Sequence, residues 1–389
     1  MNNALARPRL TGGSMPSGHA ASPGRPLRVG IVGAGIIAQV MHLHYLRELA
    51  GLYDVTAICD LSDDAVRACA DRYGIPLACT DWRDLIAEPL DAVLILTSGS
   101  HAPIAIAAAQ AGRHVLTEKP MCFSVAEGQA MVAAAEQSRV TLMVGYPKRY
   151  DPAFARFTEA AGDIRDARLL RVTTLESPLR PYIGHYRLLP PAALGGDVLS
   201  RLRADSAERV SAALGAASEL ERRVYHDVLL DTLVHEINTV RGLLGEPDTL
   251  DYVDLSEQAV TVLLRFGDLR AAIHWIDLPG IARYQMEFAL YGPGRRVTLS
   301  FPSPFLRNEP STLTVEGGDP GTARSWRSEE TVGYESGFRR ELEAFHACVL
   351  SGTVPVTSGR DGLADIALCQ AIIECHRTGR PVTAPTVTG

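Results

Sequence analysis

Short apolar runs and helical patterns alternate along the first part of the chain. The runs lie at 27–32, 53–59, 76–79, 91–96, 114–118 and 141–145, and helical spacing fills the gaps at 36–50, 66–73, 102–111 and 124–138. Continuous apolar runs are typical of strands that helices cover on both faces. We therefore predict a doubly wound, parallel α/β sheet over residues 27–147.

Beyond residue 147 strands and helices are grouped. Strand-like runs lie at 167–177 and through 250–315, and helical patterns lie at 198–220, 223–244, 335–351 and 359–378. This grouping predicts an α+β domain with a mostly antiparallel sheet over 148–389, with a helical insert at about 178–227. Residues 1–26 are rich in Gly, Pro, Ser and Ala, which indicates a disordered tail or a misassigned start codon rather than a signal peptide.

A glycine turn follows the first strand and opens the first helix. Gly33 permits a tight turn, Gly35 lets the backbone approach a pyrophosphate, and Ala38 allows the helix to pack closely on the strand. The dipole and free N–H groups of the helix N-terminus attract phosphate. We therefore expect this turn, with Ile36 and Ile37, to bind a dinucleotide, and a bare turn is the alternative.

Asp60 ends the second strand, 22 residues after Ala38. An acidic side chain at this place accepts hydrogen bonds from a ribose 2′-OH and repels a 2′-phosphate. It predicts NAD as the cofactor and leaves NADP open. The alternative is that Asp60 or Ser62 caps the next helix, and Asp60 can serve both roles.

Two further motifs carry chemistry. Lys119 follows an apolar strand and Glu118, so it is expected at the carboxyl edge of the sheet, where ligands bind in such folds. Asp231 and His235 are four residues apart in a helical pattern, which would place them one turn apart on one face. The acid could there orient an imidazole base. A salt-linked pair on a solvated helix face is the alternative.

Together and in this order, these motifs resemble those of the glucose–fructose oxidoreductase, inositol dehydrogenase and MocA family (Gfo/Idh/MocA). The resemblance runs from about residue 27 to the C-terminus and is most specific in 102–120, 143–152, 231–238 and 358–382. It implies a Rossmann domain followed by a domain with an open sheet that often forms oligomers. A homodimer or homotetramer is therefore expected.

The resemblance also implies roles for single residues. Lys119 would lie near the nicotinamide and the reacting oxygen, and His235 would be the general acid/base, oriented by Asp231. Further cofactor contacts would be Thr97, Ser98, His101 and Glu118. Lys148 or Arg149 would lie at the mouth of the site. Apart from what the resemblance implies, Tyr182, His185 and Asn238 are further candidate substrate contacts.

Three features depart from the family pattern. Leu233 stands where a Gly commonly precedes the histidine by two residues, and Asn238 stands where an Asp commonly follows it by three. The segment 178–227 is longer than usual, and its extra helix could form a lid or a subunit contact. Tyr182 and His185 lie in this segment with Tyr186, and loop packing is the alternative to a substrate contact for each.

Charge and cysteine usage narrow the classes of partner. The 389 residues carry a formal net charge of −7, which gives no electrostatic reason to expect nucleic acid or an anionic membrane. No apolar run reaches the roughly 18 residues that span a bilayer. The seven cysteines show neither a CxxC pair nor zinc-like spacing, so we expect free thiols in the cytoplasm and no metal site.

The sequence thus predicts an NAD(P)-dependent oxidoreductase that acts on a secondary alcohol or ketone of a sugar, cyclitol or related polyol. One alternative is an enzyme that keeps NAD bound and uses it transiently without net redox change, as some glycosidase relatives do. Others are a regulatory NAD(H)-binding protein and a redox enzyme for an imine or a bilin-like double bond. Retention of Lys119, Asp231 and His235 argues against a sensor, which needs none of them.

Overall fold

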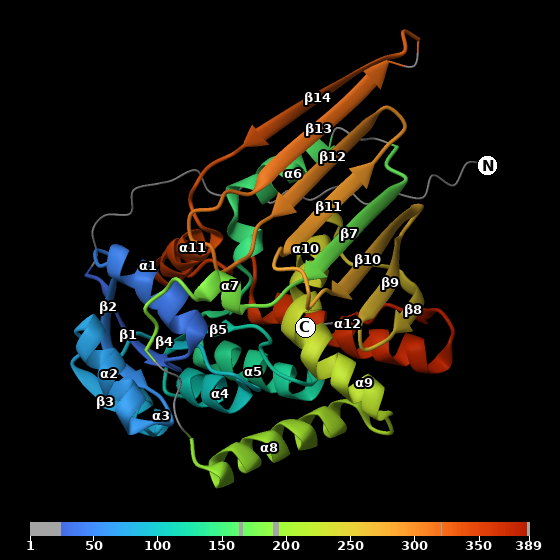
Figure 1. The fold of residues 1–389 in the computed structure, drawn as a ribbon. Coiled ribbons are helices and arrows are strands. Elements are labelled where there is room, and N and C mark those ends of the chain that lie inside the picture. The colour runs from blue at the N-terminus through green and yellow to red at the C-terminus, as the bar shows by residue number, and fades with distance from the viewer. Residues whose placement is uncertain (1–24, 163–165, 190–193, 320, 387–389) are drawn as a thin grey trace.

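The chain folds around two sheets, which the computed structural model describes for residues 25–162, 166–189, 194–319 and 321–386 (Figure 1). The expected N-terminal tail therefore lies outside the described residues, except for its last two positions. One of them, Arg25, forms two hydrogen bonds with the carboxylate of Asp91, at 2.9 and 2.8 Å. No helix among the described residues is long and apolar enough to cross a membrane.

The first sheet is entirely parallel, with the strand order β3-β2-β1-β4-β5-β6. Its strands are β1 (Leu27–Val32), β2 (Tyr53–Cys59), β3 (Leu77–Cys79), β4 (Ala92–Ile95), β5 (His114–Glu118) and β6 (Leu142–Gly145). Its helices are the π-helical η1 (Ala38–His42), α1 (Leu43–Glu48), α2 (Asp63–Tyr73), α3 (Trp82–Ala87), α4 (Ala102–Gln110) and α5 (Val125–Ser138). The order reverses between β1 and β4, so ligands are expected at the carboxyl ends of these strands.

The second sheet has the order β14-β13-β12-β11-β7-β10-β9-β8-β15. Its strands are β7 (Leu169–Glu176), β8 (Thr249–Leu255), β9 (Ala259–Phe266), β10 (Leu269–Asp277), β11 (Gln285–Tyr291), β12 (Arg295–Phe301), β13 (Thr312–Asp319), β14 (Arg324–Thr331) and β15 (Val382–Thr383). Within this sheet, as far as the structure describes it, strands β7 and β10 pair in parallel and the other neighbouring strands pair antiparallel. The α/β class and the mostly antiparallel second sheet are confirmed.

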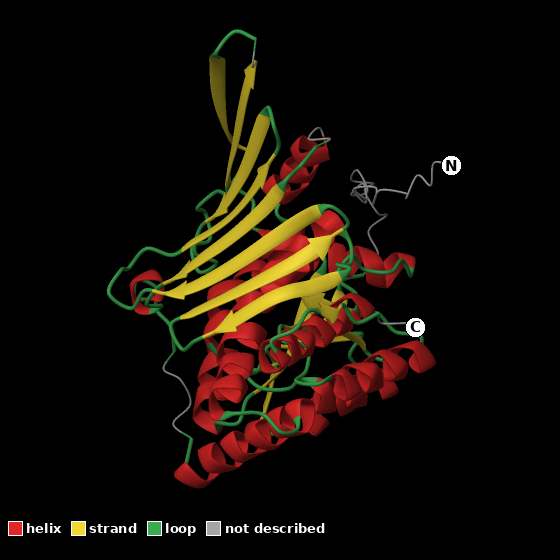
Figure 2. Cartoon of the chain, turned by 90° about the vertical axis from the view of Figure 1, so that its right-hand side faces the viewer, coloured by secondary structure: helices red, strands yellow, loops and turns green. Residues whose placement is uncertain are grey.

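Helices cover one face of the second sheet (Figure 2). The remaining helices are η2 (Pro147–Tyr150), α6 (Pro152–Gly162), α7 (Arg180–Ile183), α8 (Gly196–Leu214), α9 (Glu219–Val224), η3 (Tyr225–Leu233), α10 (Val234–Leu244), α11 (Gly337–Ser351) and α12 (Gly359–Thr378). In β9, buried and partly exposed positions alternate strictly, because every second side chain points into the helices. The opposite positions form the partly exposed face of the sheet.

Several elements differ from the predicted ones. The helical pattern at 223–244 is the end of a longer helical segment that begins with α9 and turns π-helical over η3. The helix expected within the segment 178–227 is α8, which a salt bridge between Arg209 and Glu127 joins to α5 (Figure 1). The sequence did not predict α3, α6, β14 or β15.

Candidate active site

The glycine turn and Asp60 form one hydrogen-bonded unit at the carboxyl edge of the first sheet. Gly33 has φ +107°, and a Cβ there would lie 2.7 Å from the backbone of Leu96, so only glycine fits. A Cβ at Gly35 would meet no atom within 4 Å, which leaves space for a ligand to reach the backbone. The Asp60 carboxylate accepts a hydrogen bond of 2.8 Å from the Ala34 N–H.

The residues at this edge fit a dinucleotide. Ile36 is 39% exposed at the start of the helical segment, an apolar surface that a bound ring can cover. Ser62, not Asp60, is the N-cap of α2 and accepts a hydrogen bond from Ala65, although Asp60 also contacts the Ser62 N–H at 3.4 Å. The open turn and the acid at the end of β2 thus lie where phosphate and ribose are expected.

The loop after β4 lies at the same edge. His101 is fully buried, and its Nε2 lies 2.8 Å from the carbonyl oxygen of Thr97. Burial lowers the pKa of His101, so the ring is neutral at neutral pH. Ser98 is exposed and Thr97 is half-buried. His101 therefore supports the loop from its buried side, while Thr97 and Ser98 are accessible to a ligand.

A salt bridge joins Lys119, which follows β5, to Asp231 in η3. Its ammonium lies 2.9 Å from a carboxylate oxygen of Asp231 and donates to the backbone carbonyl of the same residue. The expected hydrogen bond between Asp231 and His235 is absent from the described structure, where Nδ1 of His235 is buried without a partner. The reason is the π-helical η3, whose wider turns change the direction of Asp231.

His235 is held as a neutral imidazole. Burial lowers the pKa of His235 well below its ordinary value, and the positive charges of Lys148 and Lys119 lower it further. Its ring lies edge-on to that of Tyr146, with 5.8 Å between the centroids. A neutral imidazole beside two ammonium groups can accept a proton from a substrate hydroxyl.

Lys148 and Glu236 are both buried, and the charge of each acts on the pKa of the other, although the sequence analysis expected only Lys148 at the site. Lys148 lies inside the structure, not at the mouth of a site, and burial lowers its pKa to about 8 against the opposing charge of Glu236. Burial raises the pKa of Glu236 to about 7. The Thr174 hydroxyl donates to one oxygen of Glu236, and its other oxygen has no partner among the described residues.

Neither Glu236 nor Thr174 was expected. An acid that directly follows the predicted base in a helix with few other charges was the available signal for Glu236. Thr174 gave none, because its neighbour on another element is 62 residues away.

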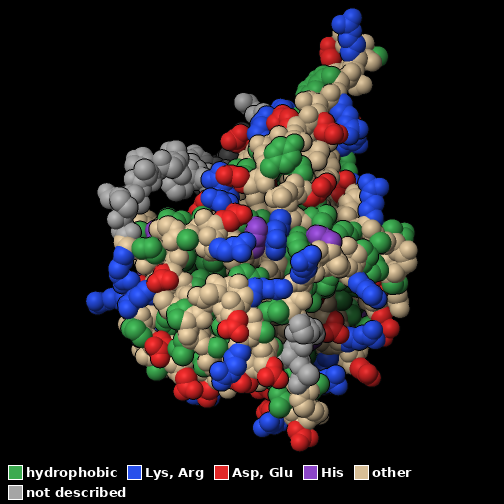
Figure 3. Space-filling model, turned by 60° about the vertical axis from the view of Figure 1, so that its left-hand side comes forward, with side chains coloured by type: hydrophobic (Ala, Val, Ile, Leu, Met, Phe, Trp, Pro, Cys, Tyr) green, Lys and Arg blue, Asp and Glu red, His purple; other side chains and the backbone are tan. Residues whose placement is uncertain are grey.

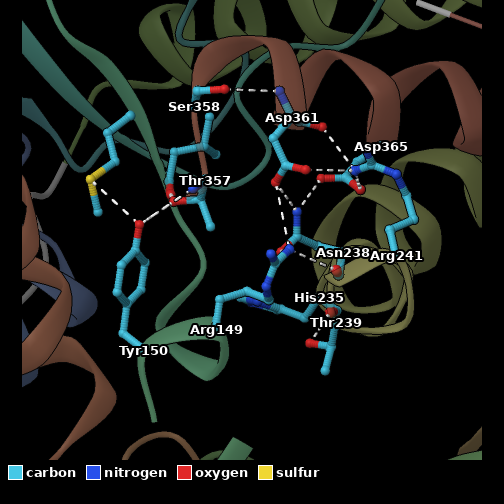
Figure 4. Close-up of polar contacts among 12 residues, drawn as sticks. Arg149, Tyr150, His235, Asn238, Thr239, Arg241, Thr357, Ser358, Asp361 and Asp365 are labelled. Carbon is cyan, nitrogen blue, oxygen red and sulfur yellow. Dashed lines mark hydrogen bonds and ion pairs between the residues drawn. The ribbon is translucent and has the colours of Figure 1, made fainter. Parts of the chain in front are cut away.

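Arg149 and Asn238, expected as substrate contacts, take part in a network of polar side chains with α12 (Figure 4). Asn238 is 0% exposed, and its amide nitrogen donates to Asp361 and Asp365, each at 2.7 Å. Arg149 donates to the side-chain oxygen of Asn238 at 3.2 Å. Asn238 lies on the side of α10 that faces α12, where Arg241 also pairs with Asp365 at 2.6 Å.

Two aromatic residues of the insert make packing contacts. The hydroxyl of Tyr182 accepts a hydrogen bond from the backbone N–H of Tyr284, and that of Tyr186 donates to the carbonyl of Phe305 at 2.7 Å. His185 is exposed, and its ring lies against that of Tyr186, with centroids 4.0 Å apart. Loop packing, the alternative reading, therefore describes Tyr182 and Tyr186.

The side chain of Glu118, expected among the cofactor contacts, is buried, and one of its oxygens lies 2.7 Å from Nε2 of His42.

Lys and Arg side chains gather with histidines across the middle of the face in Figure 3, between the upper part of the molecule, which holds the second sheet, and the lower part, which holds the first. Acidic side chains lie above and below them (Figure 3). A local excess of positive charge is favourable for an anionic ligand such as a pyrophosphate.

The chain is similar to known oxidoreductases. The family model GFO_IDH_MocA, described as "Oxidoreductase family, NAD-binding Rossmann fold", matches residues 27–146. The uncharacterized oxidoreductase YrbE of Bacillus subtilis is 33% identical over 364 residues, which cover 91% of this chain and 95% of that protein. Myo-inositol 2-dehydrogenase of Thermotoga maritima is 27% identical over 377 residues, covering 93% of this chain and all of that protein.

A solved structure shares the fold. Levoglucosan dehydrogenase in complex with NADH superposes with a TM-score of 0.72 at 20% identity, covering 93% of this chain and all of that one. Because the family model matches and the similarity to the Bacillus protein runs over nearly the full length, the chain belongs to the GFO_IDH_MocA family of NAD-binding oxidoreductases.

Proposed function

We propose that the chain transfers a hydride between NAD and a secondary alcohol or ketone of a sugar, cyclitol or related polyol. The observation that carries the proposal is the salt bridge of 2.9 Å between Lys119 and Asp231, which stands four residues before His235 in one helical segment. The charge of Lys119 also contributes to the lowered pKa of His235. Relatives named as dehydrogenases of myo-inositol and levoglucosan support the substrate class.

The cofactor contacts in this proposal are the turn with Gly33, Gly35, Ile36 and Ile37, together with Asp60, Thr97 and Ser98. Bound NAD supplies a nicotinamide ring that takes up or gives back a hydride. Asp60 favours NAD over NADP, because a carboxylate accepts a ribose hydroxyl and repels a phosphate.

The side chains of the protein move the proton and stabilise charge. In the oxidation direction, neutral His235 removes the proton of the substrate hydroxyl, and in reduction it returns it. The Lys119 ammonium stabilises the negative charge that develops on the same oxygen. Asp231 acts on Lys119 rather than on His235, because its carboxylate holds that ammonium at 2.9 Å.

Lys148 and Glu236 contribute to the same site. The Lys148 ammonium is close enough to lower the pKa of His235, and Glu236 partly neutralises it. We assign Lys148 to a second hydroxyl of the substrate, since its ammonium acts on His235 and can donate a hydrogen bond to an acceptor beside that ring.

The assembly is a homodimer or homotetramer in this proposal, with the partly exposed face of the second sheet as the contact. The seven cysteines are all free thiols, which is consistent with a cytoplasmic protein. Light scattering after size-exclusion chromatography measures the oligomeric state, and a monomer at micromolar concentration would contradict the proposed contact.

The test is an absorbance screen at the NADH band with NAD or NADP and a panel of inositols, sugars, amino sugars and their keto forms. At least one polyol is expected to reduce NAD. The variants Lys119→Met and His235→Asn should lower the rate of that step by a factor of about 10² or more, while NADH binding stays within about threefold.

Three outcomes would contradict the proposal. Copurified NAD with bond hydrolysis and no net NADH would favour the transient-redox alternative. Binding of NADH with no turnover of any polyol would favour a regulatory protein. Near-normal turnover in either variant would remove that residue from the chemistry.

A further inference from the structure

Glu118 and His42 form a buried pair directly behind the proposed chemistry. Glu118 ends β5 immediately before Lys119, and His42 ends η1, the helical segment that follows the glycine turn. One oxygen of Glu118 lies 2.7 Å from Nε2 of His42. The other accepts a hydrogen bond of 3.2 Å from the backbone N–H of Lys119. A single carboxylate thus connects the lysine backbone to the helix that carries the glycine turn.

The surroundings keep Glu118 charged and paired. Burial alone raises the pKa of Glu118, but the hydrogen bond and charge of His42, with the charge of Lys119, bring it below the ordinary value. Glu341, on α11, is fully buried nearby, and burial together with the charge of Glu118 raises its pKa well above normal. Glu341 is therefore neutral, and Glu118 is the ionised acid of the two.

The packing around His42 leaves it little freedom. Its imidazole and the ring of Phe338 are perpendicular to each other, with 5.7 Å between the centroids. Its side chain is 1% exposed, so the pair with Glu118 has little competition from water. Removal of either partner leaves the other polar group buried without its bond.

Both the backbone and the side chain of Lys119 are held by hydrogen bonds. Its backbone is bound by Glu118, and its ammonium is bound by Asp231. We propose that the His42–Glu118 pair is a positioning device, which fixes the backbone of Lys119 relative to the glycine turn so that the ammonium and the bound dinucleotide keep one geometry. This inference rests on the proposed role of Lys119. Loss of the His42–Glu118 pair matters because a displacement of Lys119 by about 1 Å can slow an enzymatic step roughly 10²-fold.

The test compares His42→Phe and Glu118→Gln with a matched control, His44→Gln. The control lies on the adjoining helix, where His44 pairs with Glu48 at 3.2 Å near the surface. Each substitution is made in the native chain and in a Lys119→Ala background. Three quantities are measured: the single-turnover rate of NADH formation, the Kd of NADH, and the melting temperature. The substrate is myo-inositol, or a faster polyol of the panel.

We expect His42→Phe and Glu118→Gln to lower the single-turnover rate about 10- to 100-fold, with the Kd of NADH within about threefold. In the Lys119→Ala background the same substitutions should change the rate less than about twofold, because the group they position is gone. His44→Gln should match its own parent chain in each background, the native chain in one and Lys119→Ala in the other. Glu118→Gln keeps the shape of the side chain and carries the test if His42→Phe fails to fold.

An equal fall in rate in both backgrounds would overturn the positioning role, because it would show an effect that does not act through Lys119. An unchanged rate in Glu118→Gln would overturn it as well. A native-like rate in Lys119→Ala alone would instead overturn the proposed role of Lys119. The two failures are therefore distinguishable.

Discussion

Asn238 gives the sharpest prediction about the buried network between α10 and α12. Both hydrogens of its amide are used, one on Asp361 and one on Asp365, each at 2.7 Å. Aspartate, the residue more common at this position in the family pattern, cannot donate either bond when it is ionised. It would instead add a third carboxylate to a site that already has two.

The magnitude follows from these contacts. Loss of the two hydrogen bonds to carboxylates in Asn238→Ala should lower the free energy of unfolding by about 3 kcal/mol, since such bonds are worth about 1.5 kcal/mol or more each. In Asn238→Asp, two like charges about 4 Å apart repel by roughly 4 kcal/mol at an effective dielectric constant near 20. Arg149 offsets part of this, so we expect Asn238→Asp to be about 3 kcal/mol less stable than Asn238→Ala at pH 8.

The difference between the two variants must depend on pH. Repulsion raises the pKa of the new carboxyl in the folded state, so the folded state binds more protons than the unfolded one and stability falls as pH rises. At pH 5, protonation of the new carboxyl costs only about 1.5 kcal/mol, because each pH unit above the ordinary aspartate pKa of about 3.9 costs about 1.4 kcal/mol. The difference between the variants should shrink to about 1.5 kcal/mol or less.

Urea unfolding followed by tryptophan fluorescence at pH 5, 6.5 and 8 measures these free energies for the native chain and both variants. Asn238→Ala separates the loss of donors from the added charge. The reasoning is refuted if Asn238→Asp is as stable as the native chain at pH 8. It is also refuted if the difference between the two variants is the same at pH 5 and pH 8.

Three further predictions concern other parts of the site. Gly33→Ala should destabilise the fold by about 1–3 kcal/mol, because φ is +107° and the added Cβ would lie 2.7 Å from the backbone of Leu96; unchanged melting and NADH binding would contradict it. Glu341→Gln should raise the free energy of unfolding by at least about 1 kcal/mol at pH 8 and by less toward pH 4. The reason is that the pKa of the Glu341 carboxyl is raised in the folded state, so the stability that this group contributes is lost as pH rises. Melting temperatures against pH test this, and a gain that grows toward acid would be the wrong sign. Asp60→Ser should raise the ratio of kcat/KM for NADP over NAD by about tenfold or more, since the charge that repels a 2′-phosphate is removed; an unchanged ratio would leave Asp60 without that role.

The sequence was sufficient for features that depend on local pattern. Apolar runs predicted the parallel strands because helices bury them on both faces, and the GxG spacing predicted a turn in which Gly33 has a positive φ. Strand β14 escaped prediction because nearly all of its residues are exposed, so no apolar period marks it. A regular spacing of apolar residues reveals only elements that bury one face, so an exposed strand leaves no such signal.

The side-chain contacts depend on distant partners, and here the sequence was less informative. Four-residue spacing suggested an Asp231–His235 pair, but the π-helical turns of η3 direct Asp231 to Lys119, which is 112 residues away. Glu118 and His42 are 76 residues apart, so their pairing could not be read from a motif. Chemistry at the site was predictable by residue type, and the partner of each group was not.

The central claim is that a hydride passes between a polyol carbon and NAD at the site of Lys119 and His235. The most direct test uses a polyol that carries deuterium on the carbon of its reacting hydroxyl, with mass spectrometry of the NADH that forms. We predict one deuterium on the nicotinamide ring and a slower single turnover than with the unlabelled polyol. NADH without the label, or a labelled polyol that is consumed with no NADH, would contradict direct hydride transfer.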